Sequence, residues 1–247
     1  MVVRIAMWSG PRNISTALMR SFDSRIDTYV SDEPLYAHYL AATGLPHPHA
    51  DAIVRTHERD WRLVAEDLLG PTPADEAVWY QKHMAHHMLP EVERDWLSGF
   101  RHAFLVREPR AMLASLVDRL GAATLEDTGL PQQLELFRWV REGLGEAPPV
   151  IDAADVLASP EATLTGLCER LDIPFDPAML SWEPGPRDTD GCWGPHWYQS
   201  TYRTTGFTEN PGPRKSLDPA YEDLAHTCSL IYDELAAQRI RPDAIDA

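Results

Sequence analysis

The sequence has few cysteines and no long apolar run. The three cysteines, Cys168, Cys192 and Cys228, are odd in number and widely spaced, so they suggest neither a disulfide framework nor a metal-binding pattern. This cysteine usage is typical of a reducing compartment, and we expect a cytoplasmic protein. No segment approaches the about 18 consecutive apolar residues that span a bilayer. The apolar start at residues 1–8 is short and lacks a cleavage site, so we expect no signal peptide.

Basic residues are scarce relative to acidic ones. The chain has 22 Lys and Arg against 38 Asp and Glu, for a formal net charge of −16. A surface of this sign repels nucleic acids and other polyanions, so we expect no nucleic-acid partner. A small anionic ligand stays compatible with it, because a pocket can be locally basic. We therefore expect a small-molecule acceptor and no membrane partner, and the sequence leaves the oligomeric state open.

Apolar runs and amphipathic stretches alternate along the chain. Strand-like runs lie at 2–8, 28–30, 77–82, 103–106 and 149–151, and helical patterns start near residues 13, 109 and 160. Near-continuous apolar strands that alternate with helices are typical of a parallel sheet covered on both faces. The sequence therefore predicts an α/β fold of three layers with a central parallel sheet of about five strands, in one domain over residues 1–247.

The stretch 174–219 breaks this alternation. It is rich in Pro, Gly and Trp and has little periodicity, and a last helix is expected at 221–239. A loop this long inside a compact domain is usually a lid or a substrate-binding segment. Its aromatic side chains either line a pocket for a flat or apolar acceptor or fix the loop to the core. The candidates for binding the acceptor are Trp193, His196 and Trp197.

The first strand leads into a loop that suits an anion. Residues 9–16 lie between a strand and a helix, where backbone N–H groups and the helix dipole favour phosphate or sulfate. Arg12 adds a cation, and Ser15 and Thr16 add hydroxyl donors. The same pattern also fits an ordinary turn with a helix N-cap. The second Gly and the Lys of the G-x-x-x-x-G-K-[ST] loop are absent, which disfavours an ATP or GTP site.

A second strand, loop and helix repeat the arrangement. Arg107 follows the apolar run 103–106, at the strand end where open α/β sheets bind ligands. Ser115 comes eight residues later, about two turns into the next helix. Taken alone, an Arg at this place is also a common structural ion-pair partner.

Together these two segments resemble the phosphate sites of sulfotransferases that use 3′-phosphoadenosine 5′-phosphosulfate (PAPS). In that family a strand leads into P-[KR]-S-G-[ST]-[ST], which holds the 5′-phosphosulfate. A later strand ends in R-x-P with a Ser eight residues after the Arg, and this pair holds the 3′-phosphate. Pro11-Arg12 with Ser15-Thr16 is similar to the first motif, and Arg107-Glu108-Pro109 with Ser115 matches the second, in the same order.

The resemblance covers about residues 2–115 and implies a P-loop NTPase-like sulfotransferase fold. It implies PAPS as donor, adenosine 3′,5′-bisphosphate as product and no metal. The residues it assigns to the donor are Gly10, Pro11, Arg12, Asn13, Ile14, Ser15, Thr16, Arg107, Ser115, Arg214 and Lys215. Three positions depart from the family: Ile14 replaces the loop Gly, Ala17 replaces an aromatic that stacks on adenine, and Ser216 ends the late R-K-G element.

Sulfuryl transfer needs charge stabilisation and a base for the acceptor hydroxyl. The resemblance places Arg12 where the family stabilises the leaving phosphate oxygen. Two residues are candidates for the base. Glu33 follows the second strand, where several branches carry a catalytic carboxylate, and otherwise it is a solvated acid at a helix start. His83 follows Lys82, where cytosolic sulfotransferases carry K-x-H, and Lys82 is a candidate to support the transferring sulfuryl group.

A metal site is the less favoured interpretation of three histidines. His83, His86 and His87 fall at i, i+3 and i+4, which on a helix would be one face, but no carboxylate or Cys partner is evident. The sequence thus predicts an enzyme that moves a sulfuryl group from PAPS to a hydroxyl or amine of a small molecule by in-line transfer. The alternatives are a P-loop-like phosphotransferase that uses ATP, and a nucleotide-binding protein that has lost turnover, which Ile14 and Ala17 leave open.

Overall fold

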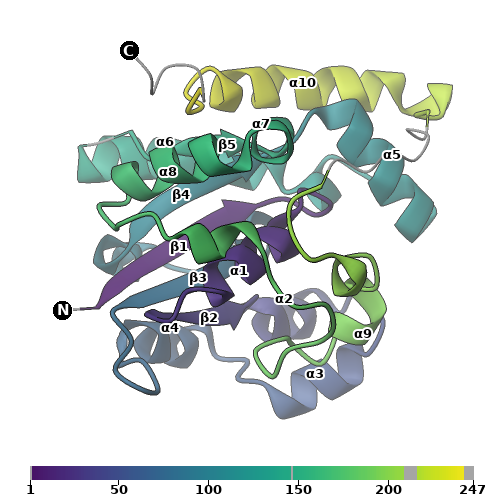
Figure 1. The fold of residues 1–247 in the computed structure, drawn as a ribbon. Helices are drawn as coiled ribbons and strands as arrows, with labels where there is room; N and C mark the ends of the chain where they lie inside the picture. The colour runs from purple at the N-terminus through teal and green to yellow at the C-terminus, as the bar shows by residue number, and fades with distance from the viewer. Residues whose placement is uncertain (1, 146, 209–215, 242–247) are drawn as a thin grey trace.

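The computed structural model describes residues 2–145, 147–208 and 216–241. One parallel sheet of five strands runs through it in the order β2-β3-β1-β4-β5 (Figure 1). The strands are β1 (Val3–Ser9), β2 (Thr28–Asp32), β3 (Val78–Met84), β4 (Arg101–Val106) and β5 (Val150–Asp152). The predicted parallel sheet of about five strands is confirmed.

β1 is the central strand and is buried on both faces. Ile5 and Met7 face one hydrophobic cluster, whereas Ala6 and Trp8 face the other, and all four side chains are fully buried. Successive side chains of a strand point to opposite faces, so a strand covered on both sides reads as an unbroken apolar run. This is why the first strand was predictable from the sequence.

Helices cover both faces of the sheet and complete three layers (Figure 1). Apolar residues of α1 and α8 pack in the cluster around Ile5 and Met7. Those of α4, α6 and α10 pack in the cluster around Ala6 and Trp8. The helices are α1 (Ser15–Asp23), α2 (Tyr36–Thr43), α3 (Ala50–Thr56), α4 (Trp61–Leu69), α5 (Pro109–Leu120), α6 (Leu130–Leu144), α7 (Ala153–Ala158), α8 (Pro160–Arg170), α9 (Gly194–Trp197) and α10 (Glu222–Ala236).

The segment expected to be irregular carries only short helical turns where it is described. They are the 3₁₀ turns η4 (Pro177–Leu180), η5 (Thr201–Arg203) and η6 (Pro219–Tyr221), together with the four-residue α9. Further 3₁₀ turns are η1 (Ala85–His87), η2 (Asp95–Gly99) and η3 (Glu126–Thr128). In Figure 1 the segment passes from η4 across the edge of the sheet, and α9 lies beside α2 and α3.

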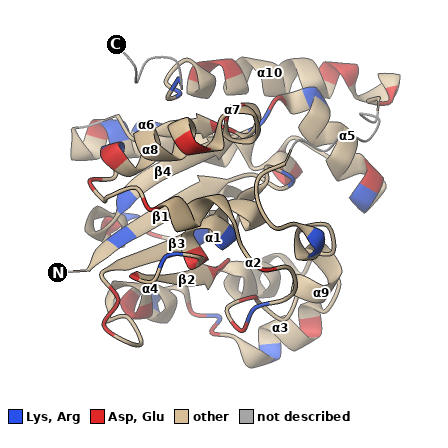
Figure 2. Cartoon of the chain, viewed as in Figure 1, with Lys and Arg blue, Asp and Glu red and all other residues tan. Residues whose placement is uncertain are grey.

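Charged residues are spread over the outside of the molecule. Figure 2 shows acidic residues on most outer helices, with basic ones interspersed. Within the described residues, none of the helices has the length and apolarity that crossing a membrane requires.

Candidate functional site

The loop after β1 has an unusual backbone. Arg12 has a φ of 64° and Ile14 a φ of 59°, both in the left-handed region. Such residues in a turn direct backbone N–H groups into a concavity of the kind that binds anions. Gly10 packs on the opposite side of the loop, where a Cβ would lie 2.3 Å from the carbonyl oxygen of Thr128, so only Gly fits there. The packing on η3 therefore fixes where the loop begins.

Ile14 preserves the conformation that a loop Gly would supply. It is the N-cap of α1 with φ 59° and ψ 15°, although a β-branched residue in this region is strained by about 1–3 kcal/mol. Its side chain packs against the core cluster around Ile5 and Met7, which offsets part of the strain. The departure from the family motif at this position thus leaves the loop shape intact.

The two predicted phosphate segments meet in one cluster of guanidinium groups. Nε of Arg12 donates to Oγ of Ser115 at 2.9 Å. Nη1 of Arg107 donates to the backbone carbonyl of Arg12 at 2.5 Å. Burial lowers the pKa of the Arg12 guanidinium, and the positive charges of Arg107 and Arg119 lower it further. The negative charge of Asp118 acts to raise this pKa. A group of cations at the ends of parallel strands is suited to an anion.

Arg119 is a member of this cluster that the sequence analysis missed. It lies on α5 four residues after Ser115, so the two side chains share a helix face. Its guanidinium lies 5.1 Å from the ring centroid of Trp197 and donates to the carbonyl of His196. The signal that could have found it is this i, i+4 spacing on a helix that the sequence does predict.

The start of α5 is set by local sequence. Pro109 occupies the first turn, and the Glu108 carboxylate accepts from the backbone N–H groups of Arg110 and Ala111 at 2.9 and 2.8 Å. A Pro in the first turn preceded by a capping acid begins a helix sharply. Ser115 is thereby held at a fixed height above the end of β4.

A second cluster lies where β2 and β3 run side by side. Nζ of Lys82 donates to Oδ1 of Asp32 at 2.8 Å, to Oε1 of Glu33 at 2.6 Å and to Oη of Tyr198 at 2.7 Å. The Lys82 side chain is only 1% exposed. These three contacts use the three protons of the ammonium group. In this structure Lys82 thus holds two carboxylates, and the expectation that it supports the transferring sulfuryl group stays a prediction.

Glu33 lies at the mouth of this cluster. Its backbone has a φ of 47°, and its side chain is 12% exposed. Burial raises the pKa of the Glu33 carboxyl, Lys82 acts to lower it, and Asp32 acts to raise it. A carboxylate whose proton affinity is raised by its surroundings is a better base than one in water.

His83 lies on the opposite face of the sheet from Lys82, as alternation along β3 requires. Its ring stacks on Trp8 at 4.6 Å, and Nε2 lies 3.2 Å from Oε1 of Gln81. Burial lowers the pKa of His83 to about 3. These contacts disfavour His83 as the base for the acceptor hydroxyl, and the choice between His83 and Glu33 stays a prediction.

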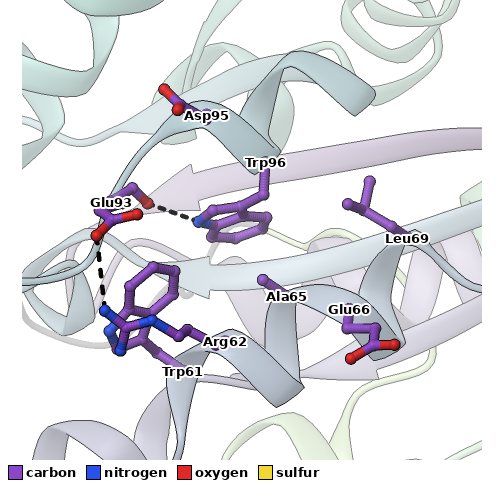
Figure 3. Close-up of a pocket in the computed structure, with 8 residues that line it drawn as sticks. All are labelled: Trp61, Arg62, Ala65, Glu66, Leu69, Glu93, Asp95 and Trp96. Carbon is purple, nitrogen blue, oxygen red and sulfur yellow. Dashed lines mark hydrogen bonds and ion pairs between the residues drawn. The ribbon is translucent and has the colours of Figure 1, made fainter.

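The face that holds His83 carries a separate groove (Figure 3). Trp96, whose ring lies 6.3 Å from that of His83, lines this groove of about 260 Å³ between α4 and η2. The other lining residues are Trp61, Arg62, Ala65, Glu66, Leu69, Glu93 and Asp95, none of which was predicted as a site residue.

The three histidines do not share a helix face. His83 is in β3, whereas His86 and His87 are in η1. No group of three or more His, Cys, Asp or Glu side chains in the described parts of the chain is arranged to hold a metal ion.

The predicted aromatic residues of the late segment lie at two places. Trp193 is buried, packs edge-on against Tyr36 and donates from Nε1 to Oη of Tyr198 at 2.9 Å. His196 and Trp197 contact Arg119 instead. Trp193 thus fixes the segment to the core. Arg214 and Lys215, the late basic pair, lie outside the described residues.

Asp32 and Tyr198 are the functional candidates that sequence analysis missed in this second cluster. Tyr198 donates to Asp32, whose Oδ2 also accepts from the backbone N–H of Gly191 at 3.1 Å. Nearby, Arg20 of α1 forms a buried ion pair of 2.7 Å with Asp190. The late segment is thus tied to both β2 and α1.

Curated proteins include relatives that match most of this chain. Branched-chain-amino-acid aminotransferase-like protein 2 of Arabidopsis thaliana is 34% identical over 231 residues, which are 94% of this chain but only 41% of that protein. This chain thus spans about two fifths of the length of that relative.

Solved structures share the fold at low sequence identity. A sulfotransferase from Alicyclobacillus acidocaldarius has a TM-score of 0.57 at 12% identity, covering 98% of each chain. The sulfotransferase domain from the curacin biosynthetic pathway has a TM-score of 0.53 at 16% identity, covering 96% of this chain and 98% of that one. Residues 3–239 match the family described as sulfotransferase domain. The chain therefore belongs to the sulfotransferase domain family.

Proposed function

We propose that the protein is a sulfotransferase that moves a sulfuryl group from PAPS to a hydroxyl or amine of a small molecule. The observation that carries this proposal is the cluster of Arg12, Arg107 and Ser115 at the carboxyl ends of β1 and β4. Arg119 is the third guanidinium group at this place, although the chain as a whole has a net charge of −16. A local excess of positive charge on an acidic protein favours a small ligand with several negative charges.

The donor would be held at both of its phosphate ends. The loop of residues 10–16 and the N-terminus of α1 offer backbone N–H groups and the hydroxyls of Ser15 and Thr16 to the 5′-phosphosulfate. Arg107, Ser115 and Arg119 suit the 3′-phosphate, since guanidinium groups bind phosphate in a bidentate manner. When the donor binds, the Arg12–Ser115 hydrogen bond would be exchanged for contacts with the nucleotide.

The residues support an in-line displacement. The acceptor oxygen or nitrogen forms a bond to sulfur while the bond between sulfur and the 5′-phosphate oxygen breaks. The electron pair of that bond leaves on the phosphate oxygen, where the permanent charge of Arg12 stabilises it. The acceptor proton goes to the Glu33 carboxylate, and the products are the sulfated acceptor and adenosine 3′,5′-bisphosphate.

Glu33 is the base that the geometry favours over His83. Glu33 lies at the mouth of its cluster, and its carboxyl has a raised pKa. His83 is enclosed on the other face of the sheet. The cytoplasmic location expected from the sequence stays a prediction.

The proposal is tested by incubating the protein with PAPS labelled in the sulfuryl group and a panel of small alcohols, phenols and amines. We expect label on an acceptor and release of an equal amount of adenosine 3′,5′-bisphosphate, both lost in Glu33→Gln. A protein that leaves PAPS intact with every acceptor, but transfers phosphate from ATP with Mg²⁺, would refute the proposal in favour of a phosphotransferase.

A further inference from the structure

The hydroxyl of Tyr198 lies at the centre of the buried charge cluster. It accepts from Nζ of Lys82 at 2.7 Å and from Nε1 of Trp193 at 2.9 Å. Its own proton is donated to Asp32, whose two carboxylate oxygens lie at 2.9 and 2.8 Å. A phenol has one proton and two lone pairs, so the two donors fill its lone pairs and its one proton is shared between Asp32 and the more distant Oε1 of Glu33 at 3.2 Å.

The two carboxylates of the cluster are held differently. Asp32 is 1% exposed and receives donors on both oxygens, from Lys82 on one and from Gly191 on the other. Both oxygens of Asp32 are thus occupied, one of them by the ammonium group of Lys82. Glu33 is the more exposed of the two, and its donors, Lys82 at 2.6 Å and Tyr198 at 3.2 Å, both contact Oε1. Glu33 is thus the carboxylate placed to exchange a proton with an incoming molecule.

Tyr198 comes from the late segment and not from the sheet. The residue before it, Trp197, lies under the guanidinium of Arg119 in the proposed donor site. Trp197 thus contacts Arg119 of the guanidinium cluster, and the next residue, Tyr198, contacts Lys82 and Asp32. The buried pair of Arg20 and Asp190 holds the same segment against α1.

We propose that Tyr198 is a positioning residue: its hydroxyl fixes Lys82 and Asp32, and Lys82 in turn holds Glu33 where it can accept the acceptor proton. This inference rests on the sulfotransferase activity proposed above. Without the hydroxyl, Lys82 keeps only its two carboxylate acceptors and Oε1 of Glu33 loses a neighbouring hydroxyl, so Glu33 is held less well and becomes a poorer base. The segment also loses one of its contacts with β2.

The pH dependence is set by the groups that surround Glu33. They are Asp32 from β2, Lys82 from β3, Tyr36 from α2 and Tyr198. Behind them, Tyr80 of β3 faces Asp32 and His87 of η1 faces Lys82. Burial raises the pKa of Glu33, whereas Lys82 and the hydrogen bond from Tyr198 act to lower it. Removal of the hydroxyl changes this balance, so the acidic limb of the rate profile is expected to move.

The test is Tyr198→Phe, which keeps the ring and removes the hydroxyl. Tyr232→Phe is a matched control, because it removes a hydroxyl that donates to the buried carboxylate of Asp152 at 2.6 Å, next to β5. We expect kcat of Tyr198→Phe to fall by about tenfold with KM for PAPS within about twofold, and the acidic limb of kcat against pH to shift. Tyr232→Phe should keep the wild-type kcat and pH profile.

Asp32→Asn and a hydrogen-exchange measurement keep the test decisive if Tyr198→Phe folds poorly. Asp32→Asn should also lower kcat, and the double variant should lose less than the product of the two single losses, because the residues act through one contact. The amide of Gly191 should exchange faster in Tyr198→Phe than in Tyr232→Phe. If the wild-type protein transfers no sulfuryl group from PAPS, both the proposed function and this inference are wrong. An active wild type whose Tyr198→Phe variant matches Tyr232→Phe in kcat, pH profile and exchange overturns this inference alone.

Discussion

Nε of Arg12 donates a hydrogen bond of 2.9 Å to Oγ of Ser115, which lies 103 residues further along the chain. Arg12 is in the loop after β1 and Ser115 is on α5, after β4. The two strands are neighbours in the sheet, with Ser9 opposite Leu105. The contact thus shows that two separate sequence motifs meet in the fold.

Arg119 should contribute to binding of the 3′-phosphate. We expect Arg119→Ala to weaken binding of adenosine 3′,5′-bisphosphate by about tenfold, the effect of one charge-assisted hydrogen bond, and Arg119→Lys to weaken it less. Arg110→Ala is the control, because Arg110 is exposed on the same helix and pairs with Glu222. Calorimetric titration measures both. If the Arg119→Ala and Arg110→Ala variants bound the bisphosphate with equal affinity, Arg119 would not be part of the site.

The left-handed backbone of Ile14 predicts an inverted order of stability for two variants. Ile14→Ala loses core packing and keeps the strained φ of 59°, so we expect it to be destabilised by about 1–3 kcal/mol. Ile14→Gly also loses the packing, but it relieves the strain and should be the more stable of the two. Urea unfolding of both variants measures the difference. An alanine variant more stable than the glycine variant would show that Ile14 is not strained.

Buried histidines should make the fold sensitive to acid. Burial lowers the pKa of His83 to about 3 and those of His86 and His102 to about 4. At His102, Nδ1 faces the donating Nε1 of Trp8 at 3.0 Å, so a second proton has no acceptor there. Because each folded-state pKa lies below the ordinary value of 6.5, the unfolded chain takes up these protons first.

The stability that these histidines contribute is therefore complete above about pH 6.5 and is lost as the pH falls toward about 4. Each of these histidines contributes at most about 1.4 kcal/mol per pH unit to the slope of the free energy of unfolding against pH. Burial raises the pKa of the Glu33 and Asp23 carboxyls, which acts in the opposite direction, whereas the lowered pKa of His87 adds to the effect of the other histidines. Urea unfolding across this range is the measurement, with His102→Phe expected to reduce the slope. A free energy of unfolding that stays constant across this range would contradict the assignment.

Substitution distinguishes the two candidates for the base. We expect Glu33→Gln to lower kcat by about a hundredfold or more, the usual contribution of a general base, and His83→Gln to stay within about threefold of the wild type. Rates of transfer across pH measure both effects. If His83→Gln lost the greater activity and Glu33→Gln kept the acidic limb, His83 would be the base and the assignment to Glu33 would be wrong.

The sheet and the approach of Arg12 to Ser115 were predictable because the strands and the motifs that follow them are short stretches of sequence. Strands buried on both faces read as apolar runs, and Arg107 and Ser115 stand at a fixed spacing across one strand end. The role of His83 was not predictable, because the expected strand ended at Lys82. β3 continues to Met84, and that extension places His83 on the face opposite Lys82.

Tyr198 could not be identified for a different reason. It lies in an aperiodic segment, and its partner Asp32 is 166 residues earlier in the chain. No periodicity or motif connects positions this far apart. Contacts of the late segment with distant elements, such as that of Trp193 with Tyr36, bring them together. Contacts made by irregular segments depend on the completed fold.

The proposed donor site is tested most directly by calorimetric titration with adenosine 3′,5′-bisphosphate, in parallel with ATP and Mg²⁺ and with the Arg107→Ala variant. We expect tight binding of the bisphosphate, weaker binding of ATP and loss of bisphosphate binding in the variant. Absence of bisphosphate binding to the wild type, or equal binding to a folded Arg107→Ala variant, would contradict the proposed donor site and with it the PAPS-dependent function.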